Sequence, residues 1–228
     1  SDNDNNNNNN NNNNKCFNKN NGLKFDHIID IIDASMIKRI AEGKNYGVCV
    51  VGEGVIDLLN SNDLKKYFDG DRDNGHEMLA LKIKDSLRIR WKKREKYINQ
   101  KMYFRAKFLG FELRASDPNA QDTILARELG YSAIYQLKKK KINATIVTMR
   151  GGNLVSIPLS EMVDYQTNEI VIKPVDIQSL SYKVSQHYMI KLLKTDLNNI
   201  ELIKKYSQIC GITTNEFIKT YKYIAVSF

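Results

Sequence analysis

The sequence has little material for disulfide or metal chemistry. Three cysteines, three histidines and three prolines are scattered through 228 residues. Cys16, Cys49 and Cys210 are odd in number and contain no Cys-x-x-Cys pair, which excludes a disulfide framework or zinc-finger type of site and indicates reduced thiols. The histidines lack the spacing of metal ligands or of a Ser-His-Asp triad. We therefore expect no metal site in the chain itself.

Long apolar stretches are also absent. The most apolar run, residues 48–51 with their neighbours, is far too short to span a bilayer. No signal peptide opens the sequence. We therefore expect a cytoplasmic protein without a membrane partner.

Positive charge is in excess, with a formal net charge of +9. Nine Lys or Arg residues and only two acids lie between Lys82 and Lys101. Such a stretch attracts nucleic acid or anionic metabolites, or it is simply the solvated face of a helix. No RNP-type aromatic motif or zinc-finger spacing accompanies the charge, so we do not expect a nucleic-acid partner.

The first 21 residues are a low-complexity segment with an unbroken asparagine run from Asn5 to Asn14. Such a tract has little to bury and cannot offset the entropy lost on ordering. We therefore predict a disordered segment over residues 1–21, a folded region over residues 22–195 and a helical tail over residues 196–228.

The fold class is indicated by the start of the folded region. Apolar residues recur every three or four positions over residues 25–41, which predicts an amphipathic helix ended by Gly43. Residues 46–51 follow as an apolar run without alternation, typical of a strand buried on both faces in a parallel sheet. We therefore predict an α/β fold with a parallel-rich sheet flanked by helices.

Similar patterns predict the elements that follow. They are a short helix after Gly54, a polar loop to about His76, a helix from Glu77 to about Asn99, a strand from Phe104 to Phe111, a helix from Gln121 to about Lys141, strands from Asn143 to Met149 and from Leu154 to Leu159, and helices around residues 176–195 and 198–209.

A carboxylate follows the predicted strand over residues 46–51, in the sequence Val50-Val-Gly-Glu-Gly54. Ligands of open α/β sheets bind at the carboxyl ends of the strands, and flanking glycines allow close approach of the backbone. Glu53 is therefore a candidate acceptor for sugar hydroxyls. A helix-capping role is equally compatible with this spacing.

Basic residues accompany the predicted strand near residue 105. Arg105 and Lys107 share a strand face by two-residue alternation, and Arg114 lies just past the strand end. The planar guanidinium fork suits phosphate, which makes these residues candidates for a phosphate pocket. An exposed basic strand edge that resists aggregation would have the same pattern.

Two segments resemble the phosphofructokinase family: residues 43–59, with Gly-Glu-Gly, and residues 108–126, with Leu109-Gly-Phe-Glu-Leu-Arg114. The resemblance implies the family's three-layer fold over residues 22–195. It also implies that Glu53 binds fructose 6-phosphate and that Arg114 holds the 6-phosphate. Arg105 matches a second arginine, which in ATP-dependent members reaches the phosphate across a subunit interface. Phe111 replaces a substrate-contacting His or Tyr.

The same resemblance implies part of a 6-phosphofructokinase, which phosphorylates fructose 6-phosphate to fructose 1,6-bisphosphate in glycolysis. The family's donor and catalytic motifs do not occur here, so we expect no catalytic residue in the chain and no turnover by it alone. Mg²⁺ with ATP or pyrophosphate would bind outside it. The expected partners are the remaining N-terminal half or other subunits of a homo- or hetero-oligomer. The alternative is a non-catalytic regulatory half that senses a sugar phosphate, and the loss of a polar group at Phe111 favours it.

Overall fold

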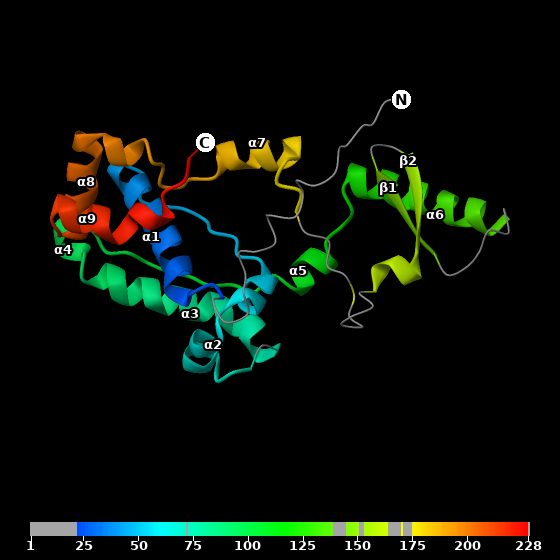
Figure 1. The fold of residues 1–228 in the computed structure, drawn as a ribbon, viewed down its shortest axis with the longest axis horizontal. Helices are drawn as coiled ribbons and strands as arrows, with labels where there is room; N and C mark the ends of the chain where they lie inside the picture. The colour runs from blue at the N-terminus through cyan, green and yellow to red at the C-terminus, as the bar shows by residue number, and fades with distance from the viewer. Residues whose placement is uncertain are drawn as a thin grey trace, which may run out of the picture. The chain divides into compact units, whose positions relative to one another are not determined.

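The computed structural model describes residues 22–71, 73–138, 145–150, 153–163, 170 and 175–227. These residues form two units, the first over residues 22–108 and 185–227 and the second over residues 109–184 (Figure 1). The segment predicted to be disordered, residues 1–21, lies outside the described residues. The predicted domain boundaries stay a prediction.

Four helices build the core of the first unit: α1 (Phe25–Ala41), α3 (Asp73–Lys92), α8 (Ile200–Cys210) and α9 (Thr214–Tyr221). Helix α1 contacts both α3 and α8, and α8 contacts α9. The side chains that are almost fully buried at the centre include Phe25, Trp91, Tyr206, Phe217 and Tyr221. The apolar periodicity of residues 25–41 therefore predicted α1 correctly, because its apolar stripe faces this core.

Two features of the region after α1 differ from the prediction. The polar loop predicted up to His76 contains helix α2 (Ser61–Phe68), which begins where the Asn60 side chain accepts a 2.9 Å bond from the Asp63 N–H. Leu64 and Phe68 of α2 are buried, which stabilises this short helix by tertiary packing. The single helix predicted over residues 77–99 is interrupted after Lys92 and continues as α4 (Glu95–Ile98).

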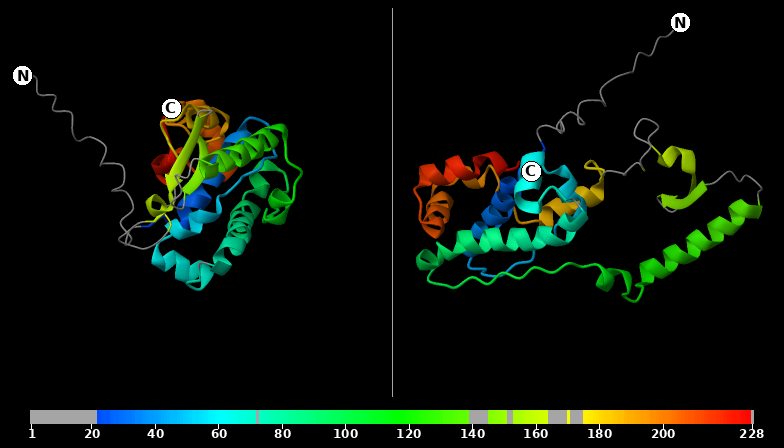
Figure 2. Two further views of the ribbon diagram at one scale, coloured as in Figure 1. Left: turned by 90° about the vertical axis from the view of Figure 1, so that its right-hand side faces the viewer. Right: turned by 90° about the horizontal axis from the view of Figure 1, so that it is seen from below.

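The strands predicted over residues 46–51 and 104–111 are not formed among the described residues. Residues 44–52 and 101–109 run as extended chain, the second segment returning alongside α3 (Figures 1 and 2). A strand needs hydrogen-bonding neighbours. The described part of the chain supplies no ladder to either segment.

The second unit contains α5 (Phe111–Arg114), α6 (Ala120–Lys138), β1 (Thr145–Arg150), β2 (Asn153–Pro158) and the 3-10 helix η4 (Leu159–Met162). Strands β1 and β2 pair antiparallel, with Ile146 opposite Ile157. They confirm the two strands predicted there. A two-residue connection can join only antiparallel strands, which explains their direction.

The α/β prediction is thus right in its mixture of helices and strands, whereas the predicted parallel-rich sheet is not seen. The one sheet within the described residues has two antiparallel strands. None of the helices in the described part of the chain is long and apolar enough to cross a bilayer.

The end of the chain packs into the first unit. Helix α7 (Leu180–Tyr188) spans the boundary between the units, and α8 corresponds to the helix predicted over residues 198–209. Helix α9 lies within the helical tail predicted over residues 196–228, but it was not predicted as a separate helix, although Thr213 and Glu216 form a reciprocal capping box at its start. Three 3-10 helices also lie in the part of this unit that the structure describes: η3 (Glu53–Leu58), η5 (Asp196–Asn198) and η6 (Lys222–Ile224).

Gly211→Ala is expected to lower the free energy of unfolding by roughly 1–2 kcal/mol, the cost of a left-handed backbone for a residue with a Cβ. Gly211 ends α8 with φ at +67°, and an added Cβ would lie 2.0 Å from a ring carbon of Tyr97. Urea denaturation would measure the change. The control is Gly52→Ala, because a Cβ at Gly52 meets no atom within 4 Å. Equal stability of the two variants would contradict the requirement for glycine at position 211.

Candidate functional site

Glu53 is the first residue of η3 and is exposed. Gly52 is the N-cap residue of η3. Glu53 therefore does not have the helix-capping role that its place in the sequence allowed. An acidic residue in a first helical turn is still favoured by the helix dipole. The carboxylate therefore lies on the surface of the first unit, directly after the extended residues 44–52.

Arg105 is exposed on the second extended segment of the first unit. Met102 and Phe104 pack against the core, whereas Tyr103, Arg105 and Lys107 point to the other side and are exposed. The two-residue alternation expected of a strand is therefore present in residues 102–107 without the ladder. Arg105 and Lys107 do lie on one face, as their spacing predicted.

Arg114 is the last residue of α5 in the second unit and is exposed. Its N–H donates to the Gly110 carbonyl at 3.3 Å. Phe111 begins the same short helix. The predicted strand over residues 104–111 thus gives way to a helical turn, which Arg114 ends. Glu53 and Arg105 belong to the first unit, and Arg114 and Phe111 to the second.

The two extended segments of the first unit are fixed where they begin. The Arg39 side chain donates to the Tyr46 carbonyl at 2.7 Å and lies over the Tyr46 ring, 5.0 Å from its centroid. Glu95 accepts from the Met102 N–H at 3.2 Å and thereby fixes the start of the second segment. Residues of α1 and α4 therefore fix the starts of the two extended segments. The first segment leads to Glu53, and the second contains Arg105.

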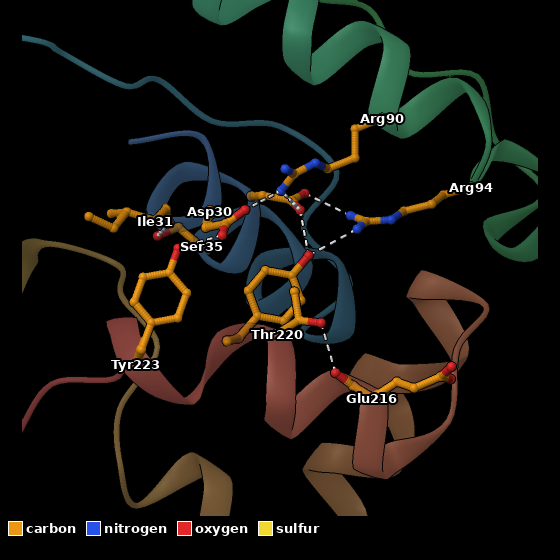
Figure 3. A network of polar contacts seen from close by, with 10 residues as sticks. Asp30, Ile31, Ser35, Arg90, Arg94, Glu216, Thr220 and Tyr223 are labelled. Carbon is orange, nitrogen blue, oxygen red and sulfur yellow. Dashed lines mark hydrogen bonds and ion pairs between the residues drawn. The ribbon is translucent and has the colours of Figure 1, made fainter. Parts of the chain in front are cut away.

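A buried ionic network joins α1 to α3 (Figure 3). Arg94 donates to the Asp33 carboxylate at 2.7 Å, and Arg90 donates to the other oxygen of Asp33 at 2.9 Å. Arg90 also donates to Asp30 at 2.6 Å. The Asp33 side chain has no exposed surface. Two carboxylates and two guanidinium groups balance in charge, which is the condition under which buried ions are tolerated.

The C-terminal region completes this network. The Tyr221 hydroxyl donates to Asp33 at 2.6 Å and accepts from Arg94 at 3.0 Å. The Tyr223 hydroxyl donates to Asp30 at 2.5 Å (Figure 3). The network therefore connects Tyr221 and Tyr223 to α1, and its arginine side chains are paired with carboxylates of the protein itself.

The environment of the network changes the pKa of its members. Burial lowers the pKa of Arg94, but the adjacent Asp33 carboxylate outweighs burial and raises the pKa overall. Burial and Asp33 both raise the pKa of the Tyr221 hydroxyl. Burial raises the pKa of the neighbouring Cys210 thiol to about 12. The arginines stay charged and the tyrosine and cysteine stay neutral at neutral pH, which makes this a structural network.

This network was not predicted from the sequence, although the spacing of its acidic and basic residues is a signal for it. Asp30 and Asp33 are three residues apart on α1 and share a helix face. Arg90 lies in the last turn of α3, and Arg94 follows four residues later as the N-cap residue of α4. Which pairs meet depends on the packing of α1 against α3. In the described residues, no three His, Cys, Asp or Glu side chains are grouped as a metal site requires.

The chain is related to the phosphofructokinase family of phosphotransferases, as its two motif segments predicted. Two curated relatives carry this relationship. A pyrophosphate–fructose 6-phosphate 1-phosphotransferase of Naegleria fowleri is 31% identical over 209 residues, and one of Thermotoga maritima is 28% identical over 206 residues. Each match covers 88% of this chain. No protein-family model matches the chain.

The chain spans about half the length of these relatives, 47% of the Naegleria protein and 49% of the Thermotoga protein. Both relatives are named for the use of pyrophosphate.

Asp33→Asn is expected to lower the free energy of unfolding by about 3–5 kcal/mol, because it leaves buried arginines without their charge partner. Asp85→Asn is the control, since Asp85 is half-exposed and lies 3.5 Å from Arg88. Surface pairs of that kind contribute about 0–1 kcal/mol. Chemical denaturation of both variants would measure the difference. A small effect of Asp33→Asn would show that the network does not stabilise the fold.

The stability of the chain is expected to fall as the pH rises above about 9. The folded pKa of Cys210 is raised to about 12, so the unfolded thiol loses its proton first and the unfolded state is favoured between these values. Urea denaturation between pH 8 and 10 would measure this slope. Cys210→Ala should reduce the slope, whatever its effect on absolute stability, and an unchanged slope would contradict the assignment.

Proposed function

We propose that the chain is the sugar-phosphate-binding part of a phosphofructokinase-type enzyme, which transfers a phosphoryl group to the 1-hydroxyl of fructose 6-phosphate. The observation that carries this proposal is the similarity, over 88% of the chain, to two relatives named for that reaction. Because the chain spans about half of each relative, the complete reaction would need residues of the kind found in their other half.

The proposed roles follow from the chemistry of three side chains. Arg114 would hold the 6-phosphate through its planar guanidinium, with Arg105 as a second phosphate contact. Glu53 would accept hydrogen bonds from sugar hydroxyls. All three side chains are exposed, which supports their availability to a ligand. The surface position of the arginines also distinguishes them from Arg90 and Arg94, which are engaged by buried carboxylates.

The proposed phosphoryl donor is pyrophosphate rather than ATP. Both curated relatives are named for pyrophosphate, and this favours the same donor for the protein to which the chain contributes. Phosphoryl transfer depends on positioning and on neutralisation of charge by Mg²⁺. We place the donor, its Mg²⁺ and the catalytic base in the other half, and the chain alone would not turn over.

The complete protein would have the phosphofructokinase-like fold and would act in glycolysis in the cytoplasm. Its assembly would be an oligomer in which the second half is either covalently continuous with this chain or a separate subunit.

A regulatory role is the second candidate. Phenylalanine at position 111 has no hydroxyl or imidazole to offer a sugar, where related enzymes place a His or Tyr. The same residues would then bind a sugar phosphate without phosphorylating it, and the bound state would change the activity of a catalytic partner.

Arg114→Ala is expected to weaken the binding of fructose 6-phosphate by about 1.5–3 kcal/mol, the range for hydrogen bonds to charged groups. Calorimetric titration of the chain with fructose 6-phosphate would measure it, with fructose and inorganic phosphate as comparison ligands. The free energy of unfolding should stay within about 0.5 kcal/mol of the unsubstituted chain, because the side chain is exposed.

Arg127→Ala is the matched control, an exposed arginine on α6 of the same unit. It should bind the sugar phosphate as the unsubstituted chain does. Equal affinities of the Arg114 and Arg127 variants would show that the assignment of Arg114 is wrong.

A further inference from the structure

The structure divides the basic stretch between Lys82 and Lys101 into two groups. Arg90 and Arg94 are paired with the buried carboxylates of α1. The other cations toward the end of the stretch are exposed: Arg88, Lys92, Lys93, Lys96 and Lys101. In the part of the chain that the structure describes, no carboxylate forms an ion pair with Lys92 or Lys93. The positive charge of this second group is therefore directed to solvent.

The exposed cations share the outer face of α3 with apolar side chains. Arg88 and Lys92 are four residues apart, and Leu81 precedes Arg88 by seven, so the three side chains lie on one side of the helix. Ile89, which is 63% exposed, adjoins them on this outer face. The opposite side of α3 faces the core.

Helix α4 continues this surface beyond the end of α3. Tyr97 is 49% exposed, and the Lys96 ammonium lies 4.8 Å from the centroid of its ring. Arginine and tyrosine are enriched in protein interfaces, which combine apolar contacts at the centre with polar groups at the rim. The outer face of α3 together with α4 has both kinds of group.

The mixture of side chains favours a protein partner over a polyanion or a bilayer. Asp85 lies on the outer face, 3.5 Å from Arg88, and would repel the phosphates of a nucleic acid. A helix that lies on a membrane needs a wide apolar stripe, and the apolar stripe of α3 is buried in the core of the unit. An acidic protein segment with apolar residues would match both the cations and Ile89.

We propose that the outer face of α3, with α4, docks an acidic amphipathic segment of another protein. The carboxylates of the segment pair with Arg88, Lys92 and Lys93, and its apolar side chains cover Ile89. Electrostatic attraction raises the rate of encounter, and the apolar contact slows dissociation. The proposal goes beyond the proposed function, because the face contains none of the residues assigned to the sugar phosphate.

The test titrates the chain with a synthetic helical peptide of about 18 residues, or five helical turns, with leucines on one face and glutamates beside them. An oligouridylate of similar length and vesicles that contain phosphatidylserine are the comparison probes. We expect the peptide to bind at an ionic strength of about 0.15 M and both comparison probes to bind at least about tenfold more weakly.

Lys92→Glu with Lys93→Glu should weaken binding of the peptide by about tenfold or more, because repulsion replaces attraction. Lys204→Glu with Lys205→Glu is the matched control, since it changes the net charge equally at two exposed lysines on α8 of the same unit. This control should change the affinity by less than about twofold, because it lies outside the proposed face.

Ile89→Lys separates apolar contact from charge, because it adds a positive charge while it removes an apolar side chain. It should weaken binding of the peptide by about tenfold. A surface that only attracts negative charge would instead bind the peptide more tightly. All these variants should keep the fold, which circular dichroism would check, because the replaced side chains are exposed.

Four results would overturn the proposal: no binding of the peptide, tighter binding of the oligouridylate or the vesicles, equal affinities of the two lysine-pair variants, or tighter binding by the Ile89 variant. In the second case a nucleic acid or a membrane would be the partner. None of these measurements involves fructose 6-phosphate, so the sugar site can fail or stand independently.

Discussion

The first unit depends on the ion pair between Asp33 and Arg94. A carboxylate without any exposed surface is tolerated only when its charge and hydrogen bonds are satisfied. Arg90 supplies such a bond from α3, Arg94 from the N-cap of α4 and Tyr221 from the end of α9. Because Asp33 needs all of these partners at once, its burial constrains how α1 packs against α3. Replacing it with apolar residues could preserve stability, but it would remove this directional constraint.

Two of the proposed ligand-binding residues, Glu53 and Arg105, lie at the end of or within extended segments outside this helical core. Residues 44–52 start at the end of α1, and residues 101–109 start after α4, so helices in the core fix the origins of the segments that bear Glu53 and Arg105. The segments themselves have no ladder in the described part of the chain. The structure therefore separates a packed helical core from the extended segments that carry Arg105 and lead to Glu53.

The sequence predicted elements where the signal is local. Apolar periodicity was sufficient for α1, and short β-rich runs separated by two glycines were sufficient for β1 and β2. Helix α2 was missed because its polar composition hides a small apolar face at Leu64 and Phe68. The strand pattern of residues 46–51 was recognised, but burial was inferred from composition, and no local pattern shows whether the covering layers are present. The contact between Asp33 and Tyr221 depends on tertiary packing, which no local sequence pattern records.

The bond between Tyr221 and Asp33 joins groups that are 188 residues apart in the chain. A growing polypeptide leaves the ribosome from its N-terminus, at a rate of about 5–20 residues per second. Helix α1 therefore emerges before Tyr221, and the bond between Asp33 and Tyr221 forms only after the residues between them have been synthesised. Closure of this long loop is a non-local event, and such events are slow. The cell must therefore keep an incomplete helical core from aggregating for the whole time that the intervening residues are being translated.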